Sequence, residues 1–412
     1  MLSAQRRRAN GSSCAWRYHH AHRPDGGFGK TIRPDSAAFY SPKNTISMTV
    51  TENTALKEIF NEVRFRQVAL DVKAVYPPFD TRRFLKIALA GLDDLTLMQR
   101  LRRMTQALHG TLPEDYRQAL GILRALAPRI EQGFSTLVLP DYVGQYGQND
   151  FDVSMDALKY FTGFGSSEFA VREFLRLDLK RALAIMKVWS RDDSDAVRRL
   201  ASEGSRPRLP WSFRLDAILA DPSLAAPILD NLRADPSLYV RKSVANHLND
   251  VTKSHPEWVL DRLATWPIEN AHTAWIAKRA LRSLIKAGNG RALAVIGARG
   301  VPDVKVSKFA VTPGQIALGE RVTFSFDLAS KCPESQRLVI DYKMHYVKKS
   351  GATAAKVFKL KELTLDGGQR VSIERTQNIR DFTTRVHYAG RHEVEILVNG
   401  VCLAKGYFDL SC

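Results

Sequence analysis

Hydrophobic residues recur at helical spacing through the middle of the chain. Between about residues 54 and 288 they occupy every third or fourth position, as at Leu175, Leu179, Leu183 and Met186, with polar residues between them. In an α-helix this spacing places the hydrophobic side chains on one face, which can pack against a neighbouring helix. The pattern therefore predicts an all-helical region.

Helix starts are marked by the motif Asp-Pro-Ser, which occurs at residues 221–223 and 235–237. The aspartate can cap the first turn of a helix by accepting hydrogen bonds from main-chain amides, and proline fits the first helical position. We therefore expect short helices that follow one another through tight turns.

Three helical segments resemble one another, namely AVRR at residues 196–199, YVRK at 239–242 and IAKR at 276–279. Their basic pairs lie 43 and then 37 residues apart, close to the period of about 40 residues in HEAT-type helical repeats. A solenoid of such repeats has a concave face, and a pair such as Arg241 and Lys242 would direct a cation into it. Ordinary solvated helix charges are the alternative for any single arginine. Three aligned pairs in a basic protein favour a face that binds a polyanion.

Beyond residue 290 hydrophobic and polar residues alternate, which is typical of β-strands. Seven segments show this alternation, at residues 304–309, 321–328, 338–347, 355–363, 369–373, 392–397 and 401–408. Asn399-Gly400 between the last two predicts a tight hairpin. Seven short strands fit an immunoglobulin-like sandwich, although this chain lacks the Cys, Trp and Cys of the antibody core. The loop containing Lys348 and Lys349 and the basic stretch 370–385 are candidate contacts for a phosphate backbone.

The patterns together predict a multidomain protein, with an all-α HEAT-like repeat solenoid at residues 48–298 and an all-β immunoglobulin-like sandwich at residues 303–412. A length of 412 residues fits two or three domains. Residues 1–47 are basic and have few hydrophobic residues, so we expect a disordered extension. Two interpretations of it remain open: a start codon assigned upstream of the true one near Met48, or a basic arm that contacts DNA phosphates.

The charge balance indicates the kind of partner. The chain has 61 Lys and Arg against 43 Asp and Glu, a net charge of +18, and a third of this excess lies in residues 1–47. Such a surface attracts a polyanion, either nucleic acid or an acidic membrane. No apolar run reaches the roughly 18 residues that cross a bilayer, and residues 1–30 lack the apolar centre of a secretory signal. We therefore expect a soluble, cytoplasmic protein that does not enter a membrane.

The cysteines and histidines show no pattern of metal ligands. The four cysteines, at positions 14, 332, 402 and 412, form no CxxC pair, and the histidines do not cluster at ligand spacing. We expect no disulfide framework, no metal and no cofactor, which disfavours a metal-dependent nuclease.

Three segments of the helical region place a carboxylate at a predicted helix end. Glu168 follows two serines and the aromatic residues 160–164, which either line a cleft or merely belong to a capped, packed helix start. Glu203 stands at a predicted helix C-terminus, where its charge opposes the helix dipole, and such local conflicts tend to mark functional sites. Asp250 ends a helix of the next repeat, where it is either a site residue or an ordinary turn residue.

Carboxylates in a basic groove suit one reaction in particular. Cleavage of the bond between deoxyribose and a cationic alkylated base passes through an oxocarbenium-like sugar, which a nearby carboxylate stabilises while it positions water. A general acid is unnecessary, because a cationic base leaves readily.

The segments at residues 160–172, 198–211 and 243–250 resemble the AlkC branch of the HEAT-like-repeat DNA alkylation repair glycosylases, and the resemblance covers about residues 48–412. It implies an enzyme that excises N3-methyladenine and N3-methylcytosine from duplex DNA enclosed by the solenoid and the sandwich. Because a chain that encloses DNA by itself needs no partner, we expect a monomer. The resemblance also implies that the acidic active-site residues are Glu168, Glu203 and Asp250, that the lesion region is contacted by Phe169 and Trp211, and that the DNA backbone is held by Arg199 and Arg206.

Two other classes of function remain open at the level of the sequence. HEAT-like solenoids often bind without catalysing, so a DNA-binding scaffold is the main alternative. A protein-interaction array whose sandwich recruits a partner is the other.

Overall fold

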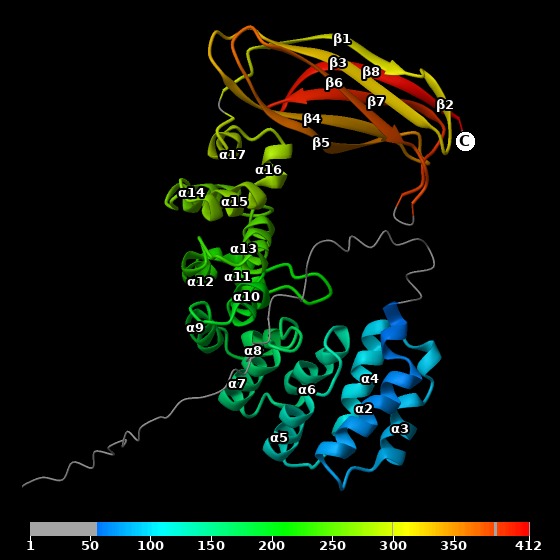
Figure 1. Ribbon diagram of the computed structural model, residues 1–412, viewed down its shortest axis with the longest axis vertical. Coiled ribbons are helices and arrows are strands. Elements are labelled where there is room, and N and C mark those ends of the chain that lie inside the picture. Colours follow the sequence, from blue (N-terminus) through cyan, green and yellow to red (C-terminus); the bar gives the residue numbers. More distant parts are fainter. Residues whose placement is uncertain (1–55, 299, 383–384, 412) are drawn as a thin grey trace, which may run out of the picture. The chain divides into compact units, whose positions relative to one another are not determined.

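The computed structural model describes residues 56–298, 300–382 and 385–411, which form helices followed by strands (Figure 1). The predicted extension at residues 1–47 lies outside the described residues. The helices are α2 (Glu62–Val75), α3 (Thr81–Leu89), α4 (Leu97–His109), α5 (Tyr116–Leu126), α6 (Val138–Tyr146), α7 (Phe151–Phe161), α8 (Val171–Leu177), α9 (Leu179–Trp189), α10 (Asp195–Gly204), α11 (Asp216–Ala220), α12 (Ala226–Asn231), α13 (Leu238–Val251), α14 (Pro256–Ala264), α15 (Ala271–Ala280), α16 (Arg282–Lys286) and α17 (Gly290–Val295). Short 3₁₀ turns are η1 (Glu58–Phe60), η2 (Leu92–Asp94), η3 (Phe134–Leu137) and η4 (Pro222–Ala225).

The three similar segments lie on helices that pack side by side, since α10 contacts α13 and α13 contacts α15 (Figure 1). The residue before each basic pair, Val197, Val240 or Ala277, is buried in the shared hydrophobic core. The repeat in the sequence therefore corresponds to a repeat of packed helices, which confirms the predicted helical-repeat fold.

The two Asp-Pro-Ser motifs behave differently. Asp221 accepts a hydrogen bond from the amide of Ser223, and Pro222 is the first residue of η4, as predicted. Asp235 accepts the corresponding bond from Ser237, but α13 begins only at Leu238. The second motif forms a turn that precedes the helix, so its aspartate does not cap the helix itself.

The C-terminal strands form two sheets, which confirms the predicted sandwich. One sheet has the order β1-β3-β6 and the other β2-β8-β7-β4-β5. The strands are β1 (Val304–Thr312), β2 (Gln315–Ala317), β3 (Arg321–Ser330), β4 (Gln336–Val347), β5 (Thr353–Leu365), β6 (Arg370–Asn378), β7 (Gly390–Val398) and β8 (Val401–Ser411). The seven predicted segments correspond to all of these except β2, which has three residues and is too short to show alternation.

The predicted hairpin joins β7 to β8, which pair in antiparallel fashion. Asn399 and Gly400 have φ angles of 46° and 81°. Two consecutive left-handed residues match the type I′ turn that Asn-Gly favours, because its twist agrees with that of the strands.

The sandwich contacts the last helices of the repeat region. Lys278 of α15 forms an ion pair with Glu362 of β5, and Val339 of β4 is buried within the helical core. The described helices and strands therefore share packed side chains where they meet.

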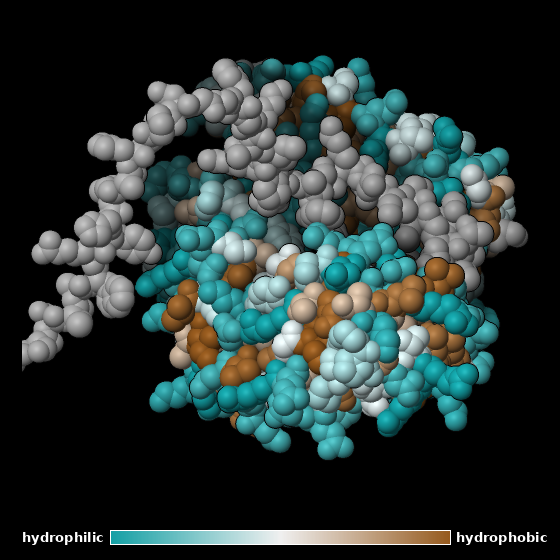
Figure 2. Space-filling view, turned by 60° about the horizontal axis from the view of Figure 1, so that its bottom comes forward, coloured by the Kyte–Doolittle hydropathy of each residue, from teal (hydrophilic) through white to brown (hydrophobic). Residues whose placement is uncertain are grey.

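The face of the molecule drawn in Figure 2 is mostly polar. Figure 2 shows a face on which hydrophilic residues predominate and hydrophobic residues gather in separate patches. Among the described residues no helix is both long and apolar enough to cross a membrane.

Cys332 and Cys402 are free thiols, and the other two cysteines lie outside the described residues.

Candidate active site

Glu203 lies in the last turn of α10, as the sequence predicts, and its side chain is only 7% exposed. The following residue, Gly204, packs against α8 so closely that a Cβ atom there would overlap Cγ1 of Val171. The absence of a side chain at residue 204 thus lets the C-terminal end of α10 approach α8 and fixes the place of Glu203.

Asp250 lies in the last turn of α13, as Glu203 does in α10, and is also buried. Because α10 and α13 pack side by side, the two carboxylates come from corresponding ends of neighbouring repeats. The repeat geometry therefore brings together acids that are far apart in the sequence.

Glu168 lies in a turn before α8, and the sequence prediction of its local structure is wrong. We expected Ser166 or Ser167 to cap a helix containing Glu168, but α8 begins only at Val171. The hydroxyl of Ser166 instead donates to Oε2 of Glu168 at 2.5 Å, and that of Ser167 donates to the carbonyl of Leu158 at 2.8 Å. The two serines hold the turn, and the turn presents Glu168.

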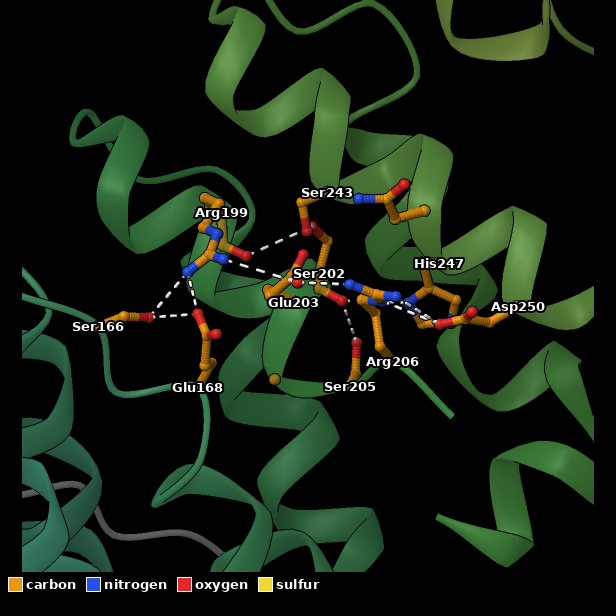
Figure 3. A network of polar contacts seen from close by, with 12 residues as sticks. Ser166, Glu168, Arg199, Ser202, Glu203, Ser205, Arg206, Ser243, His247 and Asp250 are labelled. Carbon is orange, nitrogen blue, oxygen red and sulfur yellow. Dashed lines mark hydrogen bonds and ion pairs between the residues drawn. The ribbon is translucent and has the colours of Figure 1, made fainter. Parts of the chain in front are cut away.

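Two arginines connect the three carboxylates in an alternating row, the acid–arginine cluster (Figure 3). Arg199 donates to Glu168 and to the hydroxyl of Ser166, and its Nη2 lies 3.6 Å from Oε1 of Glu203. Arg206 donates from Nη1 to Oε1 of Glu203 at 2.6 Å and from Nε to Oδ2 of Asp250 at 2.9 Å. The cluster therefore consists of Glu168, Arg199, Glu203, Arg206 and Asp250.

The cluster controls the charge of Glu203. Burial by itself disfavours the ionised carboxylate, but Arg199 and Arg206, aided by a hydrogen bond from Ser243, outweigh burial and hold the pKa of Glu203 below the ordinary glutamate value. Glu203 is therefore an anion at neutral pH.

His247 lies next to the cluster as a neutral side chain. Burial lowers its pKa to about 4, and its Nδ1 lies 3.1 Å from the carbonyl oxygen of Ser202. Its Nε2 is buried without a hydrogen-bond partner among the described residues. At neutral pH His247 adds no charge to the cluster.

A pocket of about 400 Å³ lies beside the turn that carries Glu168. Its lining includes Ser166, Phe169 and Trp211, together with residues of α4 and α6. Trp211 is 70% exposed and stands edge-on to Phe134, with ring centroids 6.5 Å apart. Two aromatic side chains that the resemblance assigned to the lesion region thus share one pocket, and the hydroxyl of Ser166 links it to the cluster.

The remaining predicted contact residues lie outside the cluster. Arg241 donates to the carbonyls of Asp235 and Pro236 at the start of α13, and Lys242 is partly exposed on the same helix. Lys348 and Lys349 are exposed in the turn between β4 and β5. Their roles in DNA binding, like those of Arg199 and Arg206, stay predictions.

Sequence reasoning missed the residues that support the cluster. Ser243 bonds to Ser202 and Glu203, and Arg172 is fully buried on α8. A signal for Arg172 was present, since it stands between Val171 and Phe174 in a run of residues that face the core.

Among the described residues, one group of three side chains is arranged closely enough to coordinate a cation. Ligand atoms of His345, Glu393 and Glu395 lie within 4.8 Å of one another on the sandwich. Lys405 already donates to both glutamates at 3.0 Å, and Lys343 contacts Glu395 at 2.6 Å. Ammonium groups thus occupy the positions where a metal ion would bind, and we assign none.

The helical part and the stranded part of the chain each match a known protein family, and one curated protein matches both parts. Residues 158–284 match the family model of the DNA alkylation repair enzymes, and residues 305–412 match the C-terminal Ig-like domain of the uncharacterised protein YhaZ. The protein YhaZ of Bacillus subtilis (strain 168) is 43% identical over 346 residues, which are 84% of this chain and 96% of that protein.

A solved structure is similar over nearly the same span. The alkylpurine DNA glycosylase AlkC of Pseudomonas fluorescens, bound to DNA containing an abasic site analog, is 58% identical, with a TM-score of 0.85. The match covers 87% of this chain and 99% of that one. The chain therefore belongs to the AlkC branch of the HEAT-like-repeat DNA alkylation repair glycosylases.

Proposed function

We propose that this protein hydrolyses the N-glycosidic bond of cationic methylated bases, N3-methyladenine and N3-methylcytosine, in duplex DNA, as a monomer without a metal or cofactor. The observation that carries the proposal is the acid–arginine cluster, a row of buried carboxylates beside a pocket with an exposed tryptophan. The similarity to an alkylpurine DNA glycosylase supports it.

Glu203 performs the central step. Its carboxylate is anionic at neutral pH, and a negative charge close to the sugar stabilises the positive charge that develops as the base departs. Both arginines contact Oε1 of Glu203, and we assign the orientation of the attacking water to Oε2.

The cluster needs no proton donor for the leaving group. A base that carries a positive charge becomes neutral when the bond breaks, so it departs without protonation. The lowered pKa of Glu203 fits this requirement, because an acid catalyst would need a raised value.

Glu168 and Asp250 extend the negative charge on either side of Glu203. Arg199 lies between Glu168 and Glu203, and Arg206 lies between Glu203 and Asp250. Each arginine fixes two carboxylates at once, so the field at the sugar is set before DNA arrives. Such preorganised charge is what makes electrostatic catalysis effective.

The test is base release by the full chain from duplex oligonucleotides that carry one N3-methyladenine or one N3-methylcytosine. The expected products are the free methylated base and an abasic strand that stays intact until heated in alkali, with or without EDTA. Salt-sensitive binding to the same duplexes without base release would instead identify a DNA-binding scaffold. Strand cleavage at neutral pH, or loss of activity in EDTA, would contradict the proposed monofunctional, metal-free reaction.

A further inference from the structure

Arg172 is a buried cation that the proposed reaction does not use. Its side chain is fully buried on α8, and its guanidinium bonds to main-chain carbonyls. Nη1 donates to the carbonyl oxygens of Gly204 at 2.9 Å and Arg206 at 2.7 Å, and Nη2 donates to that of Phe213. One side chain thus connects both ends of the loop between α10 and α11.

A buried guanidinium is costly, and burial lowers the pKa of Arg172 to about 10. That value still lies above neutral pH, so the side chain keeps its charge. Gly204 is the last residue of α10, where helix carbonyls carry partial negative charge and lack partners within the helix. By donating to the carbonyl of Gly204, Arg172 therefore caps the C-terminal end of α10, the helix that carries Glu203.

The loop held by Arg172, residues 205–215, carries two residues of the candidate site. Arg206 is the link between Glu203 and Asp250, and Trp211 lines the pocket. Trp211 has a left-handed φ of 62°, a conformation that is unfavourable for a residue other than glycine. Its side chain is mostly exposed, so packing of the indole does not explain how this conformation is held.

Phe213, two residues after Trp211, lies beside two arginines of α8. The ring of Phe213 lies near the guanidinium groups of both Arg172 and Arg176, at 5.3 and 5.1 Å from the ring centroid. Arg176 is exposed and pairs with Glu173, so it reaches the ring without bonding to the loop carbonyls. Of these two arginines, Arg172 makes the main-chain bonds that define the shape of the loop.

We propose that Arg172 is a positioning residue of the glycosylase, which fixes the 205–215 loop so that Arg206 meets the carboxylates and Trp211 stands at the pocket before DNA binds. This inference rests on the proposed function, because the loop residues are those assigned to the reaction. This positioning role requires the planar guanidinium of arginine, because a single ammonium group cannot donate to three carbonyls in the same geometry.

The test compares Arg172→Lys with the control Arg176→Lys, which changes the other cation near Phe213. Misplacing a site residue by about 1 Å can lower a rate by on the order of 100-fold. We therefore expect Arg172→Lys to reduce the single-turnover rate constant of base release by about 10- to 100-fold, and Arg176→Lys to leave it unchanged. Equal rates for wild type and a folded Arg172→Lys variant would overturn the proposal.

Two further readouts separate positioning from general stability. Trypsin should cut after Arg208, within the loop, faster in Arg172→Lys than in wild type or Arg176→Lys, at temperatures well below unfolding. If Arg172 acts through the loop, combining Arg172→Lys with Trp211→Ala should lower the rate by less than the product of the two single effects. If cleavage after Arg208 is unchanged, or if the rate losses of the two substitutions multiply fully, Arg172 does not affect base release through the 205–215 loop.

Failure to fold is also informative. Should Arg172→Lys not fold at the assay temperature, Arg172→Gln undergoes the same measurements, and failure of both variants would show that Arg172 serves the fold alone. If wild type releases no base, the proposed function fails, and the trypsin comparison still decides whether Arg172 shapes the loop.

Discussion

At the scale of single residues, the site depends on ion pairs between buried carboxylates and buried arginines. Three carboxylates would be unfavourable together in a protein interior, and the two arginines make the arrangement possible by alternating with them. The sequence allowed the three acids to be selected from predicted helix ends, and the structure places two of them, Glu203 and Asp250, in the last turn of a helix. The sequence did not reveal the whole row, because the contacts of Arg199 to Glu168 and of Arg206 to Asp250 join residues 31 and 44 positions apart.

The pH dependence of base release follows from Glu203. Its pKa is lower in the folded protein than the ordinary value of about 4.3, so ionisation of Glu203 stabilises the fold above that pH, and this stabilisation is lost as the pH falls through the folded pKa. We expect the single-turnover rate constant to stay level from pH 7 to about pH 5. A fall centred between pH 6 and 7 would show that the rate is controlled by a group other than Glu203, such as a histidine or a carboxyl with a raised pKa.

At the scale of secondary structure elements, the close approach of α10 and α8 places the central carboxylate. The hydrophobic spacing predicted the helices and most of the strands, but not where α8 starts or that β2 exists. Both errors have a local cause. Ser166 bonds to Glu168 within the turn and Ser167 bonds to a carbonyl of α7, so neither serine caps a helix, and β2 is held by parallel pairing with β8 rather than by its own pattern.

Substitution of Gly204 by alanine tests the close approach. The added Cβ would overlap the side chain of Val171, so α10 must shift, at a cost of about 1–3 kcal/mol in unfolding free energy. Base release should also slow, because Glu203 moves with the helix end. Urea denaturation and single-turnover assays measure the two effects.

The control is Gly121→Ala in α5, where the added Cβ would meet no atom within 4 Å. Alanine is a better helix former than glycine by about 0.5–1 kcal/mol, so this variant should be slightly more stable and fully active. Equal effects of the two substitutions would contradict a special packing role for Gly204.

At the scale of the whole molecule, a strongly basic chain contains a buried row of acids. The net charge of +18 indicated a polyanionic partner, but it did not distinguish a scaffold from an enzyme. The order of helical repeats and sandwich was predictable from the change in hydrophobic period near residue 290. The contacts between them were not, because Lys278 and Glu362 are 84 residues apart.

The exposed lysines of the β4–β5 turn test whether the sandwich contacts DNA. Each phosphate contact contributes about 0.9 to the slope of log affinity against log salt concentration. If Lys348 and Lys349 both contact phosphates, replacing them with alanine should reduce that slope by about 1.8. Fluorescence anisotropy with a labelled duplex at several salt concentrations provides the measurement.

Lys305→Ala is the matched control, since Lys305 is an exposed lysine on β1 of the same sandwich. Its slope should equal that of wild type. If the double variant has the same slope as wild type, Lys348 and Lys349 of the β4–β5 turn do not contact DNA phosphates.

The most direct test of the central claim is the single-turnover rate of base release by Glu203→Gln, compared with wild type on an N3-methyladenine duplex. Glutamine keeps the shape of the side chain but removes the charge, so the rate constant should fall by on the order of 100-fold or more, while affinity for the duplex is retained. Glu257→Gln, which changes an exposed glutamate paired with Arg291 on the helical surface, should behave as wild type. A Glu203→Gln variant that excises the base at the wild-type rate would contradict the assignment of Glu203 to the reaction.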